Sequence, residues 1–249
     1  MKLAIIGYGR MGHMIEEIAK QRGHKIVCII DVDNPDAFDT SDYRSADVAI
    51  EFTTPGTAVE NILKSFVSKV PVVCGTTGWL DALPDLKDMC DKGQGTLLYA
   101  SNFSIGVNVF MAVNRYLAQI MNDFPEYTPS MTEIHHIHKL DHPSGTAITL
   151  AEDMVSRVTR LDCWKEPEEG KPVGENTLPV YHERRGEVPG THMITWDSPV
   201  DKITISHEAK SREGFALGAV KAAEWLKGKK GYYTISDMLS DVTHTQGIF

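Results

Sequence analysis

One stretch of the sequence, EIHHIHKLDHPSGTA from Glu133 to Ala147, holds four of the ten histidines of the chain together with a lysine. Imidazoles exchange protons near neutral pH, and a neighbouring ammonium both binds a carboxylate and lowers the pKa of a histidine. The PSGT sequence that follows is typical of a turn into a helix, whose first N–H groups bind anions well. This combination predicts proton transfer on a small anionic substrate.

Strand alternation indicates which of these residues act together. If residues 131–137 form a strand, its two faces carry different side chains: Glu133, His135 and Ile137 on one, and Ile134, His136 and His138 on the other. His135 and Lys139 then lie on one side where the strand ends. A lone histidine is more often a structural residue than a catalytic one, but a histidine cluster with Lys139 in reach favours a functional role for this pair.

The turn after the strand is a candidate anion site. Pro143 and Gly145 shape the turn, and Ser144 or Thr146 caps the helix, which leaves backbone N–H groups pointing outward. Simple helix capping is the alternative explanation, and it is compatible with anion binding.

The sequence predicts no metal site. His136 and His138 could bind zinc from one strand face, but no third ligand is evident and the ammonium of Lys139 would repel a cation. The four cysteines show no paired metal spacing and indicate free thiols in a reducing compartment.

A second candidate site lies near the start of the chain. The glycine turn fits the GxGxxG pattern between an apolar strand and a helix, and consists of Gly7, Tyr8, Gly9, Arg10, Met11 and Gly12. About 20 residues further on, Asp31 ends the second strand, where a carboxylate binds ribose hydroxyls. No Arg or Lys stands beside Asp31 to neutralise a 2′-phosphate, which favours NADH over NADPH. A purely structural turn is the alternative.

Later strand ends add polar residues to the same crevice. The carboxyl ends of parallel strands line the ligand site of such sheets. We expect the nicotinamide half of the cofactor to contact residues that follow the third and fourth strands, namely Thr53, Thr54, Gly75, Thr76 and Thr77. Taken singly, each of these residues is better explained as part of an ordinary βα turn with a helix cap.

The elements that must position these residues change character along the chain. Short apolar strands alternate with helices up to residue 104, which predicts a parallel sheet covered on both faces: strands at 2–6, 25–30, 48–52, 70–74 and 95–100, and helices at 11–23, 57–68 and 80–91. A different pattern follows: helices at 107–122 and 147–161, a strand at 131–137, a long loop at 162–179, antiparallel strands at 191–196 and 202–209, a helix at 214–227, and a final strand and short helix at 231–240.

The charge balance limits the partners. The formal net charge of −9 disfavours nucleic acid and anionic membranes, so an anionic substrate needs a local basic pocket. The first residues show no signal-peptide pattern, and no apolar run approaches the ~20 residues of a membrane span. We expect a cytoplasmic protein.

The motif from Glu133 to Ala147 resembles the signature E-x-H-H-x-x-K-x-D-x-P-S-G-T-A of the dihydrodipicolinate reductase family. GYGRMG, CGTTGW, ASNFSIGVN, RRGEVPGTH and SREGFALGAVKAAEWL resemble further blocks of that family in the same order. Two differences stand out: the glycine turn is one residue shorter than the frequent GxxGRMG, and position 142 is His where Ala is common.

The resemblance implies NAD(P)H-dependent reduction of 4-hydroxy-tetrahydrodipicolinate, a small dicarboxylate, to tetrahydrodipicolinate with loss of water, in the diaminopimelate route to lysine. It implies a homotetramer whose subunits have two domains that close over the ligands. It assigns His135 as proton donor or acceptor, Lys139 as second proton donor and His136 as a substrate contact. Gly145 and Thr146 clasp a carboxylate. The nucleotide site comprises the glycine turn, Asp31, Gly75, Thr76, Thr77, Ala100, Ser101, Asn102 and Phe103.

We therefore predict an α/β fold with a Rossmann-type dinucleotide-binding domain and an α+β substrate-binding and oligomerisation domain. The first takes residues 1–104 and 213–249 with a parallel sheet, and the second takes residues 105–212 with an open mixed sheet.

Two other functions stay open at this point. Another Rossmann-type reductase of an imine or keto acid, such as an aspartate-dehydrogenase-like protein, would share the glycine turn but has no need for H-H-x-x-K before P-S-G-T-A. A silent NAD-binding regulator would be free to lose His135 and Lys139, and both are present.

Overall fold

The computed structural model describes residues 1–168 and 170–244, and these form two compact units. The first unit comprises residues 1–105 and 213–244, and the second comprises residues 106–212. The first boundary lies one residue after the predicted one, between residues 105 and 106, and the assignment of one ligand to each unit stays a prediction. Residues 245–249, which the sequence analysis includes in the first domain, lie outside the described residues.

The first unit is built on a six-stranded sheet with the order β11-β5-β4-β3-β1-β2, in which all neighbours are parallel. The strands are β1 (Lys2–Ile6), β2 (Lys25–Ile30), β3 (Val48–Glu51), β4 (Val72–Cys74), β5 (Thr96–Tyr99) and β11 (Gly231–Thr234). The predicted Rossmann-type sheet is confirmed. Because β1 lies between β2 and β3, the chain runs to both sides from it, and a ligand crevice is expected at this switch point.

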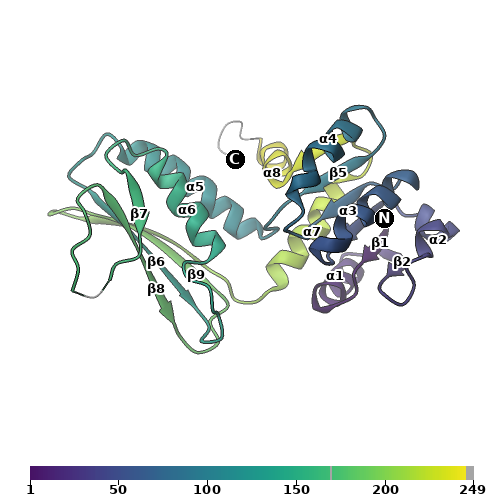
Figure 1. Ribbon diagram of the computed structural model, residues 1–249, viewed down its shortest axis with the longest axis horizontal. Helices are drawn as coiled ribbons and strands as arrows, with labels where there is room; N and C mark the ends of the chain where they lie inside the picture. Colours follow the sequence, from purple (N-terminus) through teal and green to yellow (C-terminus); the bar gives the residue numbers. More distant parts are fainter. Residues whose placement is uncertain (169, 245–249) are drawn as a thin grey trace. The chain divides into compact units, whose positions relative to one another are not determined.

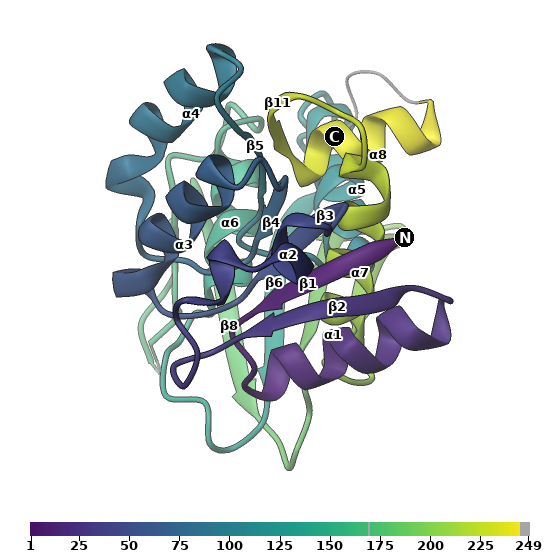
Figure 2. The ribbon, with the colours of Figure 1, turned by 90° about the vertical axis from the view of Figure 1, so that its right-hand side faces the viewer.

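Helices cover both faces of this sheet (Figures 1 and 2). One face carries α1 (Arg10–Gln21), α7 (Glu213–Leu226) and α8 (Ile235–Thr243), and the other carries α2 (Ser41–Arg44), α3 (Pro55–Val67) and α4 (Leu83–Asp91). Short 3₁₀ turns occupy Ala37–Asp39 and Leu80–Ala82. Alternate residues of β1 enter different cores: Leu3 and Ile5 pack with α1 and α7, whereas Ala4 and Ile6 pack with the α2 side. Burial on both faces explains why the interior strands β1, β3, β4 and β5 consist mostly of apolar residues.

The second unit has a five-stranded mixed sheet with the order β10-β9-β6-β8-β7. Its strands are β6 (Thr128–His135), β7 (Cys163–Lys165), β8 (Thr177–Arg184), β9 (Thr191–Asp197) and β10 (Lys202–Glu208). Helices α5 (Ile105–Met121) and α6 (Gly145–Val155) lie together over one face (Figure 1), joined by a hydrogen bond from Asn114 to the carbonyl of Leu150. Met131, Leu178, Ile194 and Trp196 fill the core between sheet and helices.

The structure corrects three predictions in this unit. The segment 162–179 is not one long loop, because it contains β7 and the start of β8. β8 was missed entirely, although it pairs in parallel with both β6 and β7. Strand β6 ends at His135 rather than at residue 137, so strand alternation does not determine the sides on which His136, Ile137 and His138 lie. The helix predicted over 147–161 ends at Val155.

Within the described residues, no helix has the combination of length and apolar character that a membrane span requires.

Candidate active site

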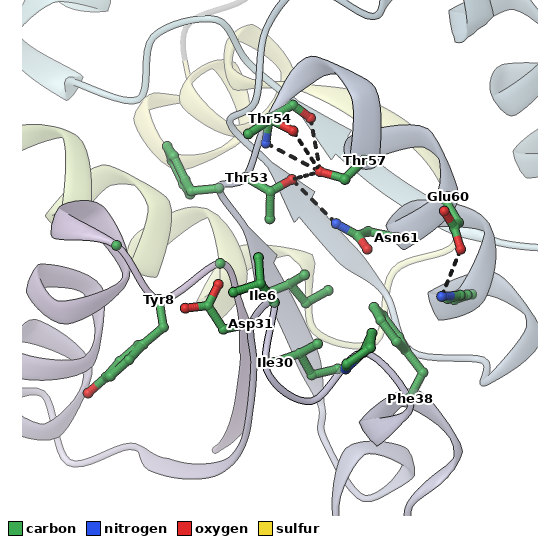
Figure 3. A pocket seen from close by; sticks show the side chains of 16 residues that line it. Ile6, Tyr8, Ile30, Asp31, Phe38, Thr53, Thr54, Thr57, Glu60 and Asn61 are labelled. Atoms are coloured by element: carbon green, nitrogen blue, oxygen red, sulfur yellow. Dashed lines mark hydrogen bonds and ion pairs between the residues drawn. The ribbon is translucent and has the colours of Figure 1, made fainter.

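A pocket of about 390 Å³ lies where β1, β2 and β3 end, at the predicted switch point (Figure 3). Residues of the glycine turn, of the β2 end and of α3 line it: Ile6, Gly7, Tyr8, Gly9, Ile30, Asp31, Val32, Pro35, Phe38, Phe52, Thr53, Thr54, Thr57, Glu60, Asn61 and Lys64. Thr53 and Thr54, predicted from their strand end, are among them. The pocket therefore joins the two sequence signals, the glycine turn and Asp31.

The glycine turn is built by close backbone approach. Gly7 has φ +89°, and a Cβ there would lie 2.1 Å from the carbonyl oxygen of Phe52. A Cβ on Gly12 would lie 2.3 Å from the carbonyl oxygen of Gly7. Gly9 precedes α1 and gives it no side-chain cap, so the first N–H groups of the helix stay available to an anion. These residues fit a dinucleotide pyrophosphate.

Asp31 is exposed at the end of β2 and is held by a local turn. Its N–H donates to Asn34 Oδ1 at 2.7 Å, and Asn34 Nδ2 donates to the carbonyl of Ile29 at 2.8 Å. Among the residues that line the pocket, the single cation is Lys64, whose Nζ lies 2.8 Å from Glu60 Oε1. Asp31 therefore presents a carboxylate to the pocket without a free positive charge among the lining residues.

Phe52 connects the glycine turn to the loop after β4. A Cβ on Gly75 would lie 2.2 Å from the Phe52 ring, and the N–H of Thr53 donates to Thr76 Oγ1 at 2.7 Å. Gly75, Thr76 and Thr77 are thus placed beside the β3 end, although they do not line the pocket.

Other predicted cofactor residues also lie outside the pocket lining. Arg10 is exposed, and Met11 packs against the core. Ala100 and Phe103 are buried in that core, and a Cβ on Gly218 would lie 1.7 Å from the carbonyl oxygen of Phe103. Ser101 and Asn102 lie between them on the loop after β5. For these residues a cofactor contact stays a prediction.

In the second unit, a buried carboxylate organises the histidine segment. Glu133 has no exposed surface, and its Oε2 accepts a hydrogen bond from the N–H of Ser144 at 3.0 Å. Its Oε1 lies 3.2 Å from Arg184, and its Oε2 lies 3.5 Å from His135 Nε2. Strand register explains this gathering, because β6 pairs His135 with Arg184 of β8 and Glu133 with His192 of β9.

Burial and neighbouring charges shift the pKa values of this cluster. Burial lowers the pKa of His135, and Lys139 and Arg184 lower it further against the opposing effect of Glu133. Burial lowers the pKa of His192 to about 4. Burial opposes ionisation of Glu133, but the hydrogen bonds from Ser144 and the charges of His135 and Arg184 outweigh it and lower its pKa. The site therefore holds a buried anion beside imidazoles that favour the neutral form.

Arg184 fixes the loop that carries Lys139. Its guanidinium donates to the carbonyl of Lys139 at 3.2 Å and to that of Asp141 at 2.7 Å. Lys139 Nζ lies 2.8 Å from both carboxylate oxygens of Asp141. Since Lys139 contributes to the lowered pKa of His135, the structure brings the two predicted catalytic residues into electrostatic reach even though the strand ends between them.

The turn before α6 has the predicted capped geometry. Ser144 is the N-cap, and its Oγ accepts from the N–H of Ala147 at 3.2 Å and lies 3.1 Å from His192 Nε2. In the described part of the chain, the N–H groups of Gly145 and Thr146 have no acceptor. Ser144 thus supplies the cap, and the two following residues offer their N–H groups to an anion.

His136 follows the end of β6 and is half-buried. Its Nδ1 is buried without a hydrogen-bond partner among the described residues, and the same holds for Nε2 of His135. A polar ligand atom is the kind of partner that such nitrogens need.

Three residues of this site were not assigned from the sequence: Glu133, Arg184 and His192. The alternation of β6 did place Glu133 on the face of His135, which was the available signal. Arg184 and His192 lie far from this motif in the sequence, and a contact across the sheet depends on strand register, which no local pattern encodes.

The ligand atoms of Glu133, His135 and His192 lie within 4.8 Å of one another, which is a spacing that a metal ion could use. However, the carboxylate already binds Arg184 and the N–H of Ser144. A cation would have to displace both, so the cluster is poorly suited to a metal ion.

Comparison with known proteins gives a consistent result along the chain. The family model "Dihydrodipicolinate reductase, N-terminus" matches residues 1–103, and "Dihydrodipicolinate reductase, C-terminus" matches residues 106–239. The 4-hydroxy-tetrahydrodipicolinate reductase of Christiangramia forsetii is 48% identical over 242 residues, which are 97% of this chain and 99% of the relative. A protein of the same name from Archaeoglobus fulgidus is 34% identical over 261 residues, with 96% and 100% coverage.

A solved structure shares the fold. The dipicolinate-bound dihydrodipicolinate reductase of Paenisporosarcina matches with a TM-score of 0.74 at 21% identity and covers 94% of this chain and 97% of its own.

Proposed function

The chain belongs to the dihydrodipicolinate reductase family, and from this premise we propose that it reduces 4-hydroxy-tetrahydrodipicolinate to tetrahydrodipicolinate with NAD(P)H and releases water. The observation that carries the proposal is the buried cluster of Glu133, His135 and Arg184 beside the free N–H groups at the start of α6. A cyclic dicarboxylate needs both parts, a proton carrier for its ring and a clasp for its charge.

We assign the clasp to Gly145 and Thr146, with Ser144 holding the turn. The N–H groups of Gly145 and Thr146 form the positive end of the α6 dipole, which would bind a substrate carboxylate. Lys139 adds a positive charge to the clasp once its ammonium leaves Asp141 and pairs with the substrate carboxylate. His136 offers its Nδ1, which has no partner among the described residues, to the substrate.

We assign proton transfer to His135, with Lys139 as a second proton donor. When bound, the nicotinamide supplies a hydride to the ring carbon that carries the hydroxyl group. The hydroxyl group takes up one proton and leaves as water. Overall, one hydride and one proton enter and one water departs. His135 suits this step because its lowered pKa favours the neutral imidazole, which exchanges a proton readily, while Glu133 stabilises the charged form when it arises.

The glycine-turn pocket would hold the dinucleotide, and we propose NADH as the preferred cofactor. The carboxylate of Asp31 would bind ribose hydroxyls, and it would repel the phosphate of NADPH. Lys64 does not offset this repulsion freely, because Glu60 is its partner.

We further propose a cytoplasmic homotetramer. Cys28, Cys74, Cys90 and Cys163 are free thiols, as expected in a reducing compartment. An exposed apolar stripe runs along α5 with helical spacing, formed by Val109, Val113, Tyr116 and Ile120, and such a stripe is typical of an interface. Light scattering coupled to gel filtration measures the subunit number directly.

The test of the activity couples the protein to a dihydrodipicolinate synthase and follows the absorbance of NADH and of NADPH in separate reactions. We expect consumption of both, faster with NADH. His135→Gln should lower kcat by roughly 10²–10⁴-fold with a smaller change in substrate affinity, because it removes general acid–base help. His138→Gln is the matched control, since His138 is exposed and pairs with Glu187.

Absence of consumption with either cofactor would disprove the activity. Normal turnover of His135→Gln with a large loss of substrate affinity would instead reassign His135 to binding.

A further inference from the structure

We propose that His142, Glu166 and His182 form a binding site for a first-row divalent metal ion, with Zn²⁺ as its best-suited occupant. The three ligand atoms lie within 4.8 Å of one another. His142 Nδ1 lies 3.0 Å from Glu166 Oε1, and His182 Nδ1 lies 2.8 Å from the same oxygen. This site shares no residue with the cluster around Glu133, and metal binding to it can be measured without catalytic turnover.

The donors come from three different parts of the second unit. His142 precedes the turn into α6, Glu166 follows directly after β7, and His182 lies within β8. Since β7 and β8 pair in parallel, the sheet holds the second and third donors, and the first reaches them from the loop. Such a set of donors from separate elements is typical of a metal site, because binding closes a loop onto a rigid support.

The chemistry of the donors fits zinc. Two imidazoles and one carboxylate form a ligand set that Zn²⁺ accepts with a water in the fourth position. Bonds of about 2.0–2.1 Å in a tetrahedron separate the donor atoms by about 3.3 Å, so the present spacing must open by a few tenths of an ångström.

The imidazole rings must also turn. The rings of His142 and His182 are stacked, with centroids 4.2 Å apart and planes 20° apart, and an ion has to lie in the plane of each ring it binds. The side chains of His142 and His182 are 49% and 36% exposed, which leaves solvent beside both rings for this rotation.

The charge on Glu166 distinguishes this cluster from that of Glu133. Among the ion pairs of the described residues, Glu166 has two histidine partners and neither Lys nor Arg. Glu133, by contrast, is neutralised by Arg184. A metal ion at Glu166 would therefore not have to displace a lysine or an arginine.

A bound metal ion would restrain the turn before α6, because His142 stands two residues before the N-cap Ser144. The metal would tie this turn to β7 and β8 independently of substrate.

The test is isothermal titration of ZnCl₂ into tag-free, chelator-treated full-length protein at pH 7.5. We expect one ion per chain with a Kd on the order of 10 µM or lower. His142→Ala, Glu166→Gln and His182→Ala should each weaken binding roughly ten-fold or more, because each removes a direct ligand. His138→Ala is the control, since it removes an exposed histidine that pairs with a carboxylate outside the cluster.

Circular dichroism and NADH binding show that each variant is folded, and the visible absorption of bound Co²⁺ reports its coordination geometry without turnover. Binding weaker than about 100 µM in the unaltered protein would overturn the proposal. Unchanged affinity in His142→Ala and His182→Ala, with loss in His192→Ala, would overturn it as well and locate the ion at Glu133.

Discussion

The two candidate ligand regions are formed by different parts of the residues: one by backbone atoms and the other by side chains. The glycine-turn pocket is shaped by backbone, since Gly7 and Gly12 lie against carbonyl oxygens and α1 offers uncapped N–H groups. The histidine region is shaped by ionisable side chains from three strands around the buried carboxylate of Glu133. The first region is therefore sensitive to added atoms, and the second is sensitive to unbalanced charge.

The charge-built region should respond most strongly to loss of its anion. Glu133→Leu leaves the guanidinium of Arg184, whose side chain is 18% exposed, without its carboxylate. We expect a loss of about 3–5 kcal/mol in the free energy of unfolding, measured by urea titration. The control Glu183→Leu breaks an exposed pair with Arg185 and should cost about 1 kcal/mol or less. Equal losses in both variants would show that burial of charge does not organise the region.

Acid should destabilise the same region. The pKa of His192 falls from 6.5 to about 4 on folding, so below pH 6.5 the unfolded chain binds the proton more readily than the folded chain does. The free energy of unfolding should therefore decrease as the pH falls from 6.5 to 4, by about 3 kcal/mol from this residue. Urea titrations at several pH values should show a shallower decrease in His192→Gln. His138→Gln, which alters an exposed histidine, should keep the full decrease; an equally steep decrease in His192→Gln would contradict the assignment.

The backbone-built region should respond to a single methyl group. Gly7→Ala forces a Cβ toward the carbonyl oxygen of Phe52 in a left-handed backbone, so we expect NADH affinity to fall roughly ten-fold or more in a fluorescence titration. Gly23→Ala is a matched control, since its φ is +80° but a Cβ there would meet none of the described atoms within 4 Å. It should lower stability and leave NADH affinity unchanged. An equal loss of affinity in both variants would attribute the effect to backbone strain alone.

The smallest effect concerns a charge at the edge of the backbone-built region. Asp31→Ser removes the carboxylate that would repel a 2′-phosphate, so the ratio of kcat/KM for NADH to that for NADPH should fall about ten-fold. Asp33→Ser, two residues further along the same exposed loop, is the control. An unchanged ratio in Asp31→Ser would mean that another residue selects the cofactor.

The same contrast explains what the sequence could predict. The interior strands of the first unit, β1, β3, β4 and β5, are buried on both faces and therefore form apolar runs that stand out in the sequence. β8 does not stand out, because Tyr181 and His182 are exposed and Pro179 interrupts the pattern. Pro179 pairs with β7, whereas pairing with β6 begins at Val180, so the proline lies where the strand changes partners.

The site could be predicted only as far as local spacing reaches. Alternation along β6 placed Glu133 and His135 together, and the PSGT motif predicted a cap at Ser144 or Thr146, of which the structure has Ser144. Arg184 and His192 enter through the pairing of β6 with β8 and β9, and no local pattern encodes that register.

Phe52 has a practical consequence for redesign. Its carbonyl oxygen leaves no room for a Cβ at Gly7, and its ring leaves none at Gly75. Two loops that are distant in sequence are therefore shaped by the same residue. A glycine turn grafted from a different reductase would pack against a Phe52 position that does not match it, and would lose its conformation. Grafts that aim to change cofactor use should carry all three positions as one cassette.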